Sequence, residues 1–178
     1  MVALGHNARR TGAEVLADML SGYGVTHVFM VPAVLRRTFA EMERRTNIAR
    51  IHCHGEKSAA YMADGYARAS GKPGICMAQV IGALNLAAGL RDAYLAHSPV
   101  IAMTGGRDPK TKFRRFYHEV DDVPAFEAVT KMNVTIDHVS RIPEMVRQAF
   151  RTATTGAPGP VHIQFRGNEG QIDAEEAE

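Results

Sequence analysis

One stretch of the chain decides its fold, and it reads His54-Gly55-Glu56-Lys57-Ser58-Ala59-Ala60-Tyr61-Met62-Ala63-Asp64-Gly65-Tyr66-Ala67-Arg68. It follows a short apolar run, residues 49–53, that has the length of a buried strand. The carboxylate of Glu56 therefore opens an alanine-rich helix directly after a strand. Small side chains on that helix leave room for a neighbouring backbone or a flat ligand, so the pattern predicts an acid placed against one ligand atom. Acidic residues are also common in first helical turns, and a capping role for Glu56 is the alternative.

The alternation of strand and helix extends over most of the chain. Apolar runs that predict strands occupy residues 26–31, 49–53, 74–79, 99–104, 132–137 and 160–165. Helical patterns occupy residues 34–45, 82–96 and 142–152, in addition to the Glu56 helix and a first helix that opens with a capping box at Thr11 and Glu14. Strands that alternate with helices predict an α/β fold, here a three-layer αβα sandwich around a six-stranded parallel sheet. Ligands of such sheets bind at the carboxyl ends of the strands.

Composition narrows the class of protein. A chain of 178 residues with 46% hydrophobic residues suits one domain with a substantial core. The net charge of +2 gives no reason to expect nucleic acid as a partner, and no apolar run approaches the roughly 18 residues of a membrane span. Cys53 and Cys76 fall in predicted strands, which favours reduced core cysteines and a cytoplasmic location. We expect the domain to occupy residues 1–166 and the acidic residues 167–178 to form a flexible tail or a linker stub.

Further motifs lie before and after the Glu56 helix, in a fixed order along the chain. They are Val31-Pro32, Ser70-Gly71-Lys72-Pro73-Gly74, Gly82-Ala83-Leu84-Asn85, Ser98-Pro99-Val100, Tyr117-His118-Glu119 and Thr155-Gly156-Ala157-Pro158-Gly159-Pro160. Together with Glu56, this pattern resembles the pyrimidine-binding, N-terminal domain of thiamine-diphosphate-dependent enzymes. The resemblance is greatest to the acetolactate synthase and 2-hydroxyacyl-CoA lyase branch, and it covers roughly residues 10–166.

The resemblance implies a role for each candidate site residue. Glu56 would hydrogen-bond the N1′ nitrogen of the cofactor's aminopyrimidine and drive it to the imino tautomer, the base that removes the thiazolium C2 proton. The cofactor would be lined by Pro32, Ala33, Ile81 and Asn85. His118 would reach the active centre, where the family has glutamine; a surface histidine is the alternative reading. The implied reaction is that of a lyase, transferase or decarboxylase acting on a 2-oxo acid or a 2-hydroxyacyl thioester.

Several positions depart from the family pattern. Ala33-Val34 replaces Gly-Gly, which predicts the loss of a close backbone approach or of a positive φ at that turn. Ile81 replaces proline and Leu84 replaces threonine, although an apolar wall survives both exchanges. These departures keep open a second reading, a non-catalytic paralogue that acts as an interaction or regulatory module.

The chain also lacks half of the expected site. In the family, Mg²⁺ and the diphosphate are held by a Gly-Asp-Gly motif and a downstream asparagine on another domain, and this chain has neither. The resemblance therefore implies a partner subunit or domain, with a homodimer when the chain is alone and a hetero-oligomer with the partner. We expect no metal site in the chain itself, because His52 and Cys53 point to opposite faces of a strand. The basic loop 107–115 suits a phosphate-bearing substrate, an acidic partner or simple solvation.

Overall fold

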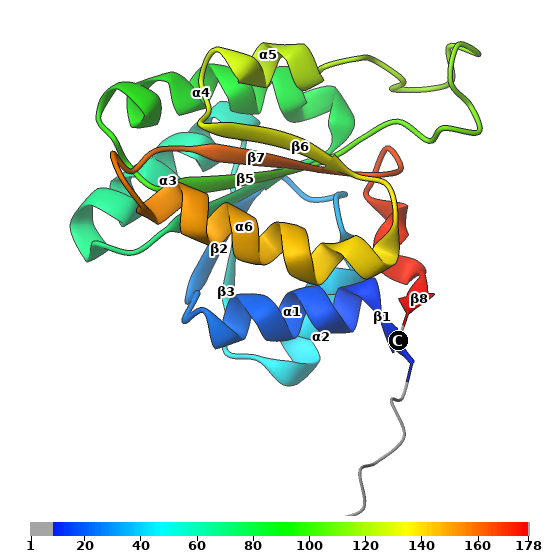
Figure 1. Ribbon diagram of the computed structural model, residues 1–178, viewed down its shortest axis with the longest axis horizontal. Helices are drawn as coiled ribbons and strands as arrows, with labels where there is room; N and C mark the ends of the chain where they lie inside the picture. The colour runs from blue at the N-terminus through cyan, green and yellow to red at the C-terminus, as the bar shows by residue number, and fades with distance from the viewer. Residues whose placement is uncertain (1–8, 178) are drawn as a thin grey trace, which may run out of the picture.

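A six-stranded sheet forms the centre of the computed structural model, which describes residues 9–177 (Figure 1). All neighbouring strands are parallel, in the order β3-β2-β4-β5-β7-β6. The strands are β2 (His27–Met30), β3 (Ala49–His52), β4 (Gly74–Ala78), β5 (Val100–Gly105), β6 (Met132–Ile136) and β7 (Val161–Phe165). The prediction of an αβα fold around a six-stranded parallel sheet is confirmed.

Helices cover both faces of the sheet (Figure 1). One face packs against α1 (Gly12–Gly22), α2 (Arg36–Arg45) and α6 (Ile142–Thr154), through large side chains such as Leu16, Met42 and Phe150. The other face packs against α3 (Glu56–Ser70), α4 (Ala83–Leu95) and the short α5 (Val123–Glu127), mostly through alanines. Central strands are buried on both faces, which explains why they read as continuous apolar runs. None of the helices within residues 9–177 has the length and apolarity needed to cross a membrane.

The capping box predicted at the start of the first helix is present. The hydroxyl of Thr11 accepts the backbone N–H of Glu14 at 3.2 Å, and the Glu14 carboxylate accepts the backbone N–H of Thr11 at 2.9 Å. The Glu14 carboxylate also accepts the Thr11 hydroxyl at 3.0 Å, and the two hydrogen bonds to this carboxylate lower the pKa of Glu14, with the one from the Thr11 backbone as the larger cause. This reciprocal pair fixes where α1 begins.

The C-terminal segment corrects one expectation. Residues 167–177 do not form a flexible tail: they include η3 (Gln171–Ala174) and β8 (Glu176–Ala177), and β8 pairs antiparallel with β1 (Arg10–Thr11). The buried carboxylate of Asp173 accepts both the backbone N–H and the hydroxyl of Thr38, each at 3.0 Å. Asp173 thus caps α2, whose own N-cap residue, Leu35, provides no side-chain hydrogen bond. One acidic residue of this segment, Asp173, thus has a capping role that composition alone does not reveal.

Candidate functional site: the carboxyl edge of the sheet

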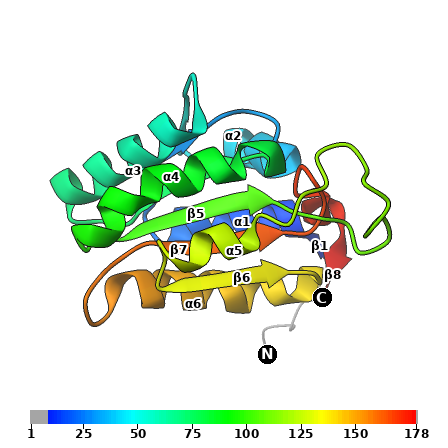
Figure 2. The same ribbon diagram turned by 90° about the horizontal axis from the view of Figure 1, so that it is seen from above.

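Glu56 is the first residue of α3 and is half-buried. The preceding Gly55 is extended, with φ of −164° and ψ of 153°, and serves as the N-cap without a side chain. The neighbouring helix α4 lies alongside α3, and both begin at the edge where the parallel strands end (Figure 2). The Nδ2 amide of Asn85, in the first turn of α4, donates to the Oε2 atom of Glu56 at 3.2 Å. The structure therefore brings together two of the predicted site residues.

Gly82 opens the Gly82-Ala83-Leu84-Asn85 motif, but the sequence analysis did not include it among the predicted site residues. A Cβ atom at this position would lie 2.3 Å from Glu56 Oε1 and 2.5 Å from Glu56 Cδ. The Glu56 carboxylate thus lies directly against the backbone of Gly82, in space that any other residue type would fill. The sequence held a signal for this contact, because a glycine at a strand-to-helix turn indicates that the backbone there lies close to another group.

Small residues also set the distance between α3 and α4. A Cβ atom at Gly89 would lie 2.7 Å from the Cβ of Ala60 and 2.8 Å from the carbonyl oxygen of Lys57. This close packing bears out the expectation that the alanine-rich face of the Glu56 helix admits a neighbouring backbone. It also holds the first turns of the two helices at a separation that lets Asn85 reach Glu56.

The Asp64-Gly65-Tyr66-Ala67-Arg68 part of the deciding stretch has a structural role. Arg68 forms an ion pair with the buried Asp64, with Nη2 and Oδ2 2.7 Å apart, and donates to the carbonyl oxygen of Asp92 on α4 at 3.5 Å. Burial raises the pKa of Asp64, but the hydrogen bonds and charge of Arg68 outweigh it and leave the pKa below its usual value. The motif thus fastens the far end of α3 to α4.

The turn after β2 corrects the expectation for Ala33. Its φ is +94°, so the positive φ that suits the glycine of the family pattern is retained here. The alanine that adopts this conformation is strained. Leu35 is also left-handed, at φ +48°, which explains why α2 begins at Arg36 and not at residue 34. The C-terminal segment supports this turn, because the Leu35 N–H donates to the carbonyl oxygen of Glu169 at 2.7 Å. Pro32, at the start of the turn, is exposed.

Two apolar side chains project from the same edge. Ile81, in η1 (Val80–Gly82), is 53% exposed, and Leu84, at the start of α4, is 51% exposed. The expected helix 82–96 therefore begins as a 3₁₀ turn, which carries Ile81 out of the protein interior. Exposed apolar residues beside a partly buried carboxylate are what an aromatic ring requires of one half of its binding site.

His118 lies in the long loop between β5 and α5 and is left-handed, at φ +63°. Its ring stacks on that of Tyr117 with the centroids 3.5 Å apart, and its Nδ1 atom is buried without a hydrogen-bond partner in the described chain. No hydrogen bond joins His118 to Glu56 or Asn85 within residues 9–177. The structure thus leaves this predicted site residue apart from the Glu56 pair.

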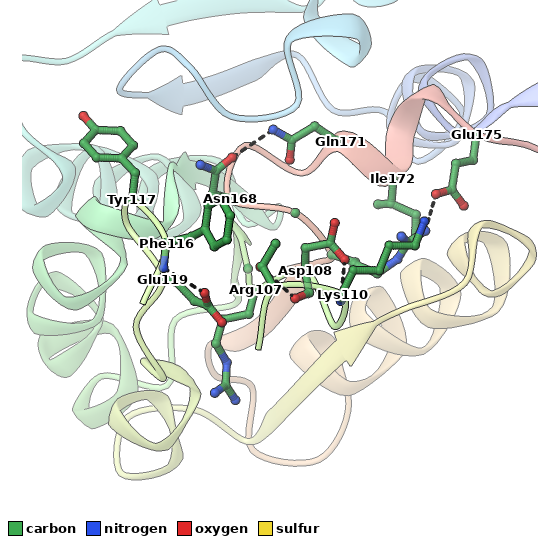
Figure 3. A pocket seen from close by; sticks show the side chains of 14 residues that line it. Arg107, Asp108, Lys110, Phe116, Tyr117, Glu119, Asn168, Gln171, Ile172 and Glu175 are labelled. Atoms are coloured by element: carbon green, nitrogen blue, oxygen red, sulfur yellow. Dashed lines mark hydrogen bonds and ion pairs between the residues drawn. The ribbon is translucent and has the colours of Figure 1, made fainter. Parts of the chain in front are cut away.

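The same loop borders a cavity of about 470 Å³ that is distinct from the Glu56 surface. Figure 3 shows it between the loop residues Arg107, Phe116 and Tyr117 and the C-terminal residues Asn168 and Gln171. Glu56 is not among the residues that line this cavity.

A buried polar network anchors the end of this loop, and sequence patterns did not reveal it. Gln164 Nε2 donates to Asp122 Oδ1 at 2.8 Å, while Asp122 Oδ2 is buried and lacks a partner in the described chain. Burial raises the pKa of Asp122 to about 6. Nearby, the buried ring of His162 contacts Thr104 Oγ1 at 2.8 Å and Asn133 Oδ1 at 2.7 Å, and burial lowers its pKa to about 3.

The histidine and cysteine side chains at the end of β3 do not come together as metal ligands would. His52 and His54 are exposed, and Cys53 is half-buried with its sulfur 3.5 Å from that of Met62. Residues 9–177 contain no group of three or more His, Cys, Asp or Glu side chains placed to hold a metal ion.

Comparisons with known proteins agree on one family. The family described as "Thiamine pyrophosphate enzyme, N-terminal TPP binding domain" matches residues 10–125. A probable acetolactate synthase large subunit of Methanocaldococcus jannaschii is 39% identical over 167 residues, which is 92% of this chain and 28% of that protein. The chloroplastic acetolactate synthase 2 of Brassica napus is 38% identical, over 88% of this chain and 25% of that protein. The chain thus spans about a quarter of the length of the curated relatives it matches.

Proposed function

The chain belongs to the thiamine pyrophosphate enzyme family, as its N-terminal, TPP-binding domain, and we propose that it supplies the pyrimidine-binding half of a thiamine-diphosphate-dependent active site. One observation carries the proposal: Glu56 stands at the start of α3, half-buried, oriented by Asn85 and pressed against Gly82. A carboxylate in that setting can share a proton with a ring nitrogen.

The surrounding residues suit an aminopyrimidine ring. Ile81 and Leu84 offer exposed apolar surface beside the carboxylate, and Gly82 leaves the backbone open to close approach. Pro32 and Ala33 would border the ring from the turn after β2. When bound, the cofactor would supply a carbanion next to a carbonyl group. The part of Glu56 would be to hold a proton at the N1′ position and so set the protonation of the ring.

The exposed apolar side chains of Ile81 and Leu84, at the edge where Glu56 lies, support a site completed by a second domain or subunit. That half would hold Mg²⁺ and the diphosphate, as the resemblance to the family implies. The relatives matched are acetolactate synthases, which favours a 2-oxo acid substrate over a 2-hydroxyacyl thioester. His118 would then meet the substrate and not the cofactor, because it belongs to the loop between β5 and α5 and not to α3 or α4.

Self-association through α3 and α4 forms part of the same proposal. Tyr61 and Met62 on α3 are each 43% exposed, and Leu84 on the neighbouring α4 is 51% exposed. We expect two copies of the chain to pack through this face. Sedimentation of the isolated chain measures its oligomeric state. A monomer at high concentration would contradict the expectation.

The test of function uses the assembled enzyme, in which the diphosphate-binding half is present. Glu56→Gln keeps the size of the side chain and its hydrogen bond but removes the transferable proton. We expect calorimetric titration to give cofactor binding in both forms, and turnover of a 2-oxo acid to fall by about 10²–10⁴ in the variant. An assembled protein that does not bind thiamine diphosphate would favour the alternative, a non-catalytic interaction module. The observation that favours this alternative is the strained Ala33, which stands where the family has glycine.

A further inference from the structure

The side chain of Asn85 forms the one hydrogen bond that Glu56 makes through its carboxylate within residues 9–177. We infer that Asn85 is a positioning residue, which fixes the orientation of the Glu56 carboxylate and does not itself contact the ligand. The inference rests on the proposed function of Glu56 and assigns to Asn85 a role other than the cofactor contact expected from its motif.

The two carboxylate oxygens of Glu56 have different surroundings. Oε2 accepts the Asn85 amide at 3.2 Å, whereas Oε1 lies against Gly82 and has no hydrogen-bond partner in the described chain. Rotation of the carboxyl group would break the amide contact, and Gly82 limits the space into which the group can turn. The hydrogen bond therefore leaves Oε1 as the carboxylate oxygen with no hydrogen-bond partner in the described chain.

The chemistry of the donor supports this role. A lysine or arginine at position 85 would form an ion pair and favour the charged carboxylate, which opposes proton sharing with a ring nitrogen. A neutral amide orients the carboxylate with a smaller bias toward the ionised form. The close contact of Gly89 with Ala60 fixes the spacing of α3 and α4, so the geometry of the pair does not depend on flexible segments.

The first arm of the test uses the chain alone. In ¹⁵N-labelled protein, the side-chain amide resonances of Asn85 should shift, and their exchange with water should quicken, when Glu56→Ala removes the acceptor. Arg91→Ala, an exposed change on the same helix, is the control and should leave these resonances in place. Unchanged Asn85 resonances in Glu56→Ala would overturn the inference, whatever the chain's function.

The second arm uses the assembled enzyme and an isosteric pair of variants. Asn85→Ala removes the donor, while Asn85→Asp keeps the shape and places an acceptor opposite Glu56. If Asn85 acts as a donor, thiamine diphosphate affinity should fall about tenfold in Asn85→Ala and further in Asn85→Asp, since an unpaired or repelled carboxylate loses a charge-assisted hydrogen bond. A role in packing alone predicts that Asn85→Asp matches the wild type, and that result would overturn the inference. A wild-type enzyme that binds no cofactor would instead refute the proposed function, while the amide measurement would still decide the role of Asn85.

Discussion

Asp122 provides a test of the structure that is independent of any ligand. Its side chain is buried, with 1% of the residue exposed, and only one of its two carboxylate oxygens has a hydrogen-bond partner in the described chain. Burial raises its pKa from 3.8 to about 6, against smaller opposing effects that include the hydrogen bond from Gln164. The folded state therefore binds a proton more tightly than the unfolded state does. Stability from this group is greatest below the unfolded pKa and declines as pH rises through the folded pKa.

The size of the effect follows from proton linkage. Integrated between pH 4.5 and pH 7, a shift of this size lowers the free energy of unfolding by about 2 kcal/mol, an upper value because any water that reaches the carboxyl reduces it. Carboxyls such as Asp18, whose pKa is lowered by Arg45, lose their contribution only at lower pH and do not act in this window. Asp122→Asn keeps an acceptor for Gln164 and removes the buried charge. The variant should therefore lack this decline.

Urea unfolding followed by circular dichroism measures the prediction, because the chain has no tryptophan for fluorescence. At each pH, the unfolding free energy of the wild type is subtracted from that of the variant. The histidines titrate in both proteins, so their contribution cancels in this difference. It should grow by about 2 kcal/mol in favour of Asp122→Asn from pH 4.5 to pH 7. The control is Asp137→Asn, an exposed aspartate that is not among the groups that shift the pKa of Asp122, and it should give a nearly constant difference. Parallel pH profiles for Asp122→Asn and wild type would refute the reasoning.

Three further predictions concern the framework of the site. Ala33→Gly should raise the free energy of unfolding by about 1 kcal/mol, because glycine adopts a φ of +94° without strain; an unchanged urea midpoint would contradict this. Gly82→Ala should displace Glu56, since the new Cβ would lie 2.3 Å from Oε1. The variant should bind thiamine diphosphate more weakly in the assembled enzyme, while its far-ultraviolet circular dichroism spectrum stays the same. Unaltered affinity would count against the contact between Glu56 and Gly82. Asp173→Ala should destabilise the chain by about 1–2 kcal/mol through loss of the α2 cap, and a change under 0.5 kcal/mol would mean that the C-terminal segment does not hold the helix.

The order of the strands and helices could be predicted because it depends on local patterns. Continuous apolar runs identify strands that are buried on both faces, and alanines at helical spacing identify α3, whose neighbour α4 packs closely against it. Glu56 and Asn85 could be placed at the same edge because parallel strands all end there. Their direct hydrogen bond could not be predicted, since it depends on the close approach at Gly89 and Gly82.

Long-range features explain what the sequence analysis missed. Asp173 caps its helix through Thr38, which lies 135 residues earlier in the chain, and nothing in the acidic composition near Asp173 indicates that partner. The left-handed Ala33 was unexpected because alanine rarely adopts a positive φ, and the Leu35–Glu169 hydrogen bond that supports the turn again joins distant segments. Asp122 and His162 owe their shifted pKa values to burial between elements, which no local pattern encodes.

The most direct test of the central claim is the rate at which the C2 proton of bound thiamine diphosphate exchanges with solvent in the assembled enzyme. Glu56 is proposed to set the protonation of the cofactor ring, so Glu56→Gln should bind the cofactor and exchange this proton about 10²–10⁴ times more slowly than the wild type. His118→Ala should exchange it at nearly the wild-type rate, because that residue lies on the loop and forms no hydrogen bond with Glu56 within residues 9–177. Equal exchange rates in wild type and Glu56→Gln would contradict the role assigned to Glu56.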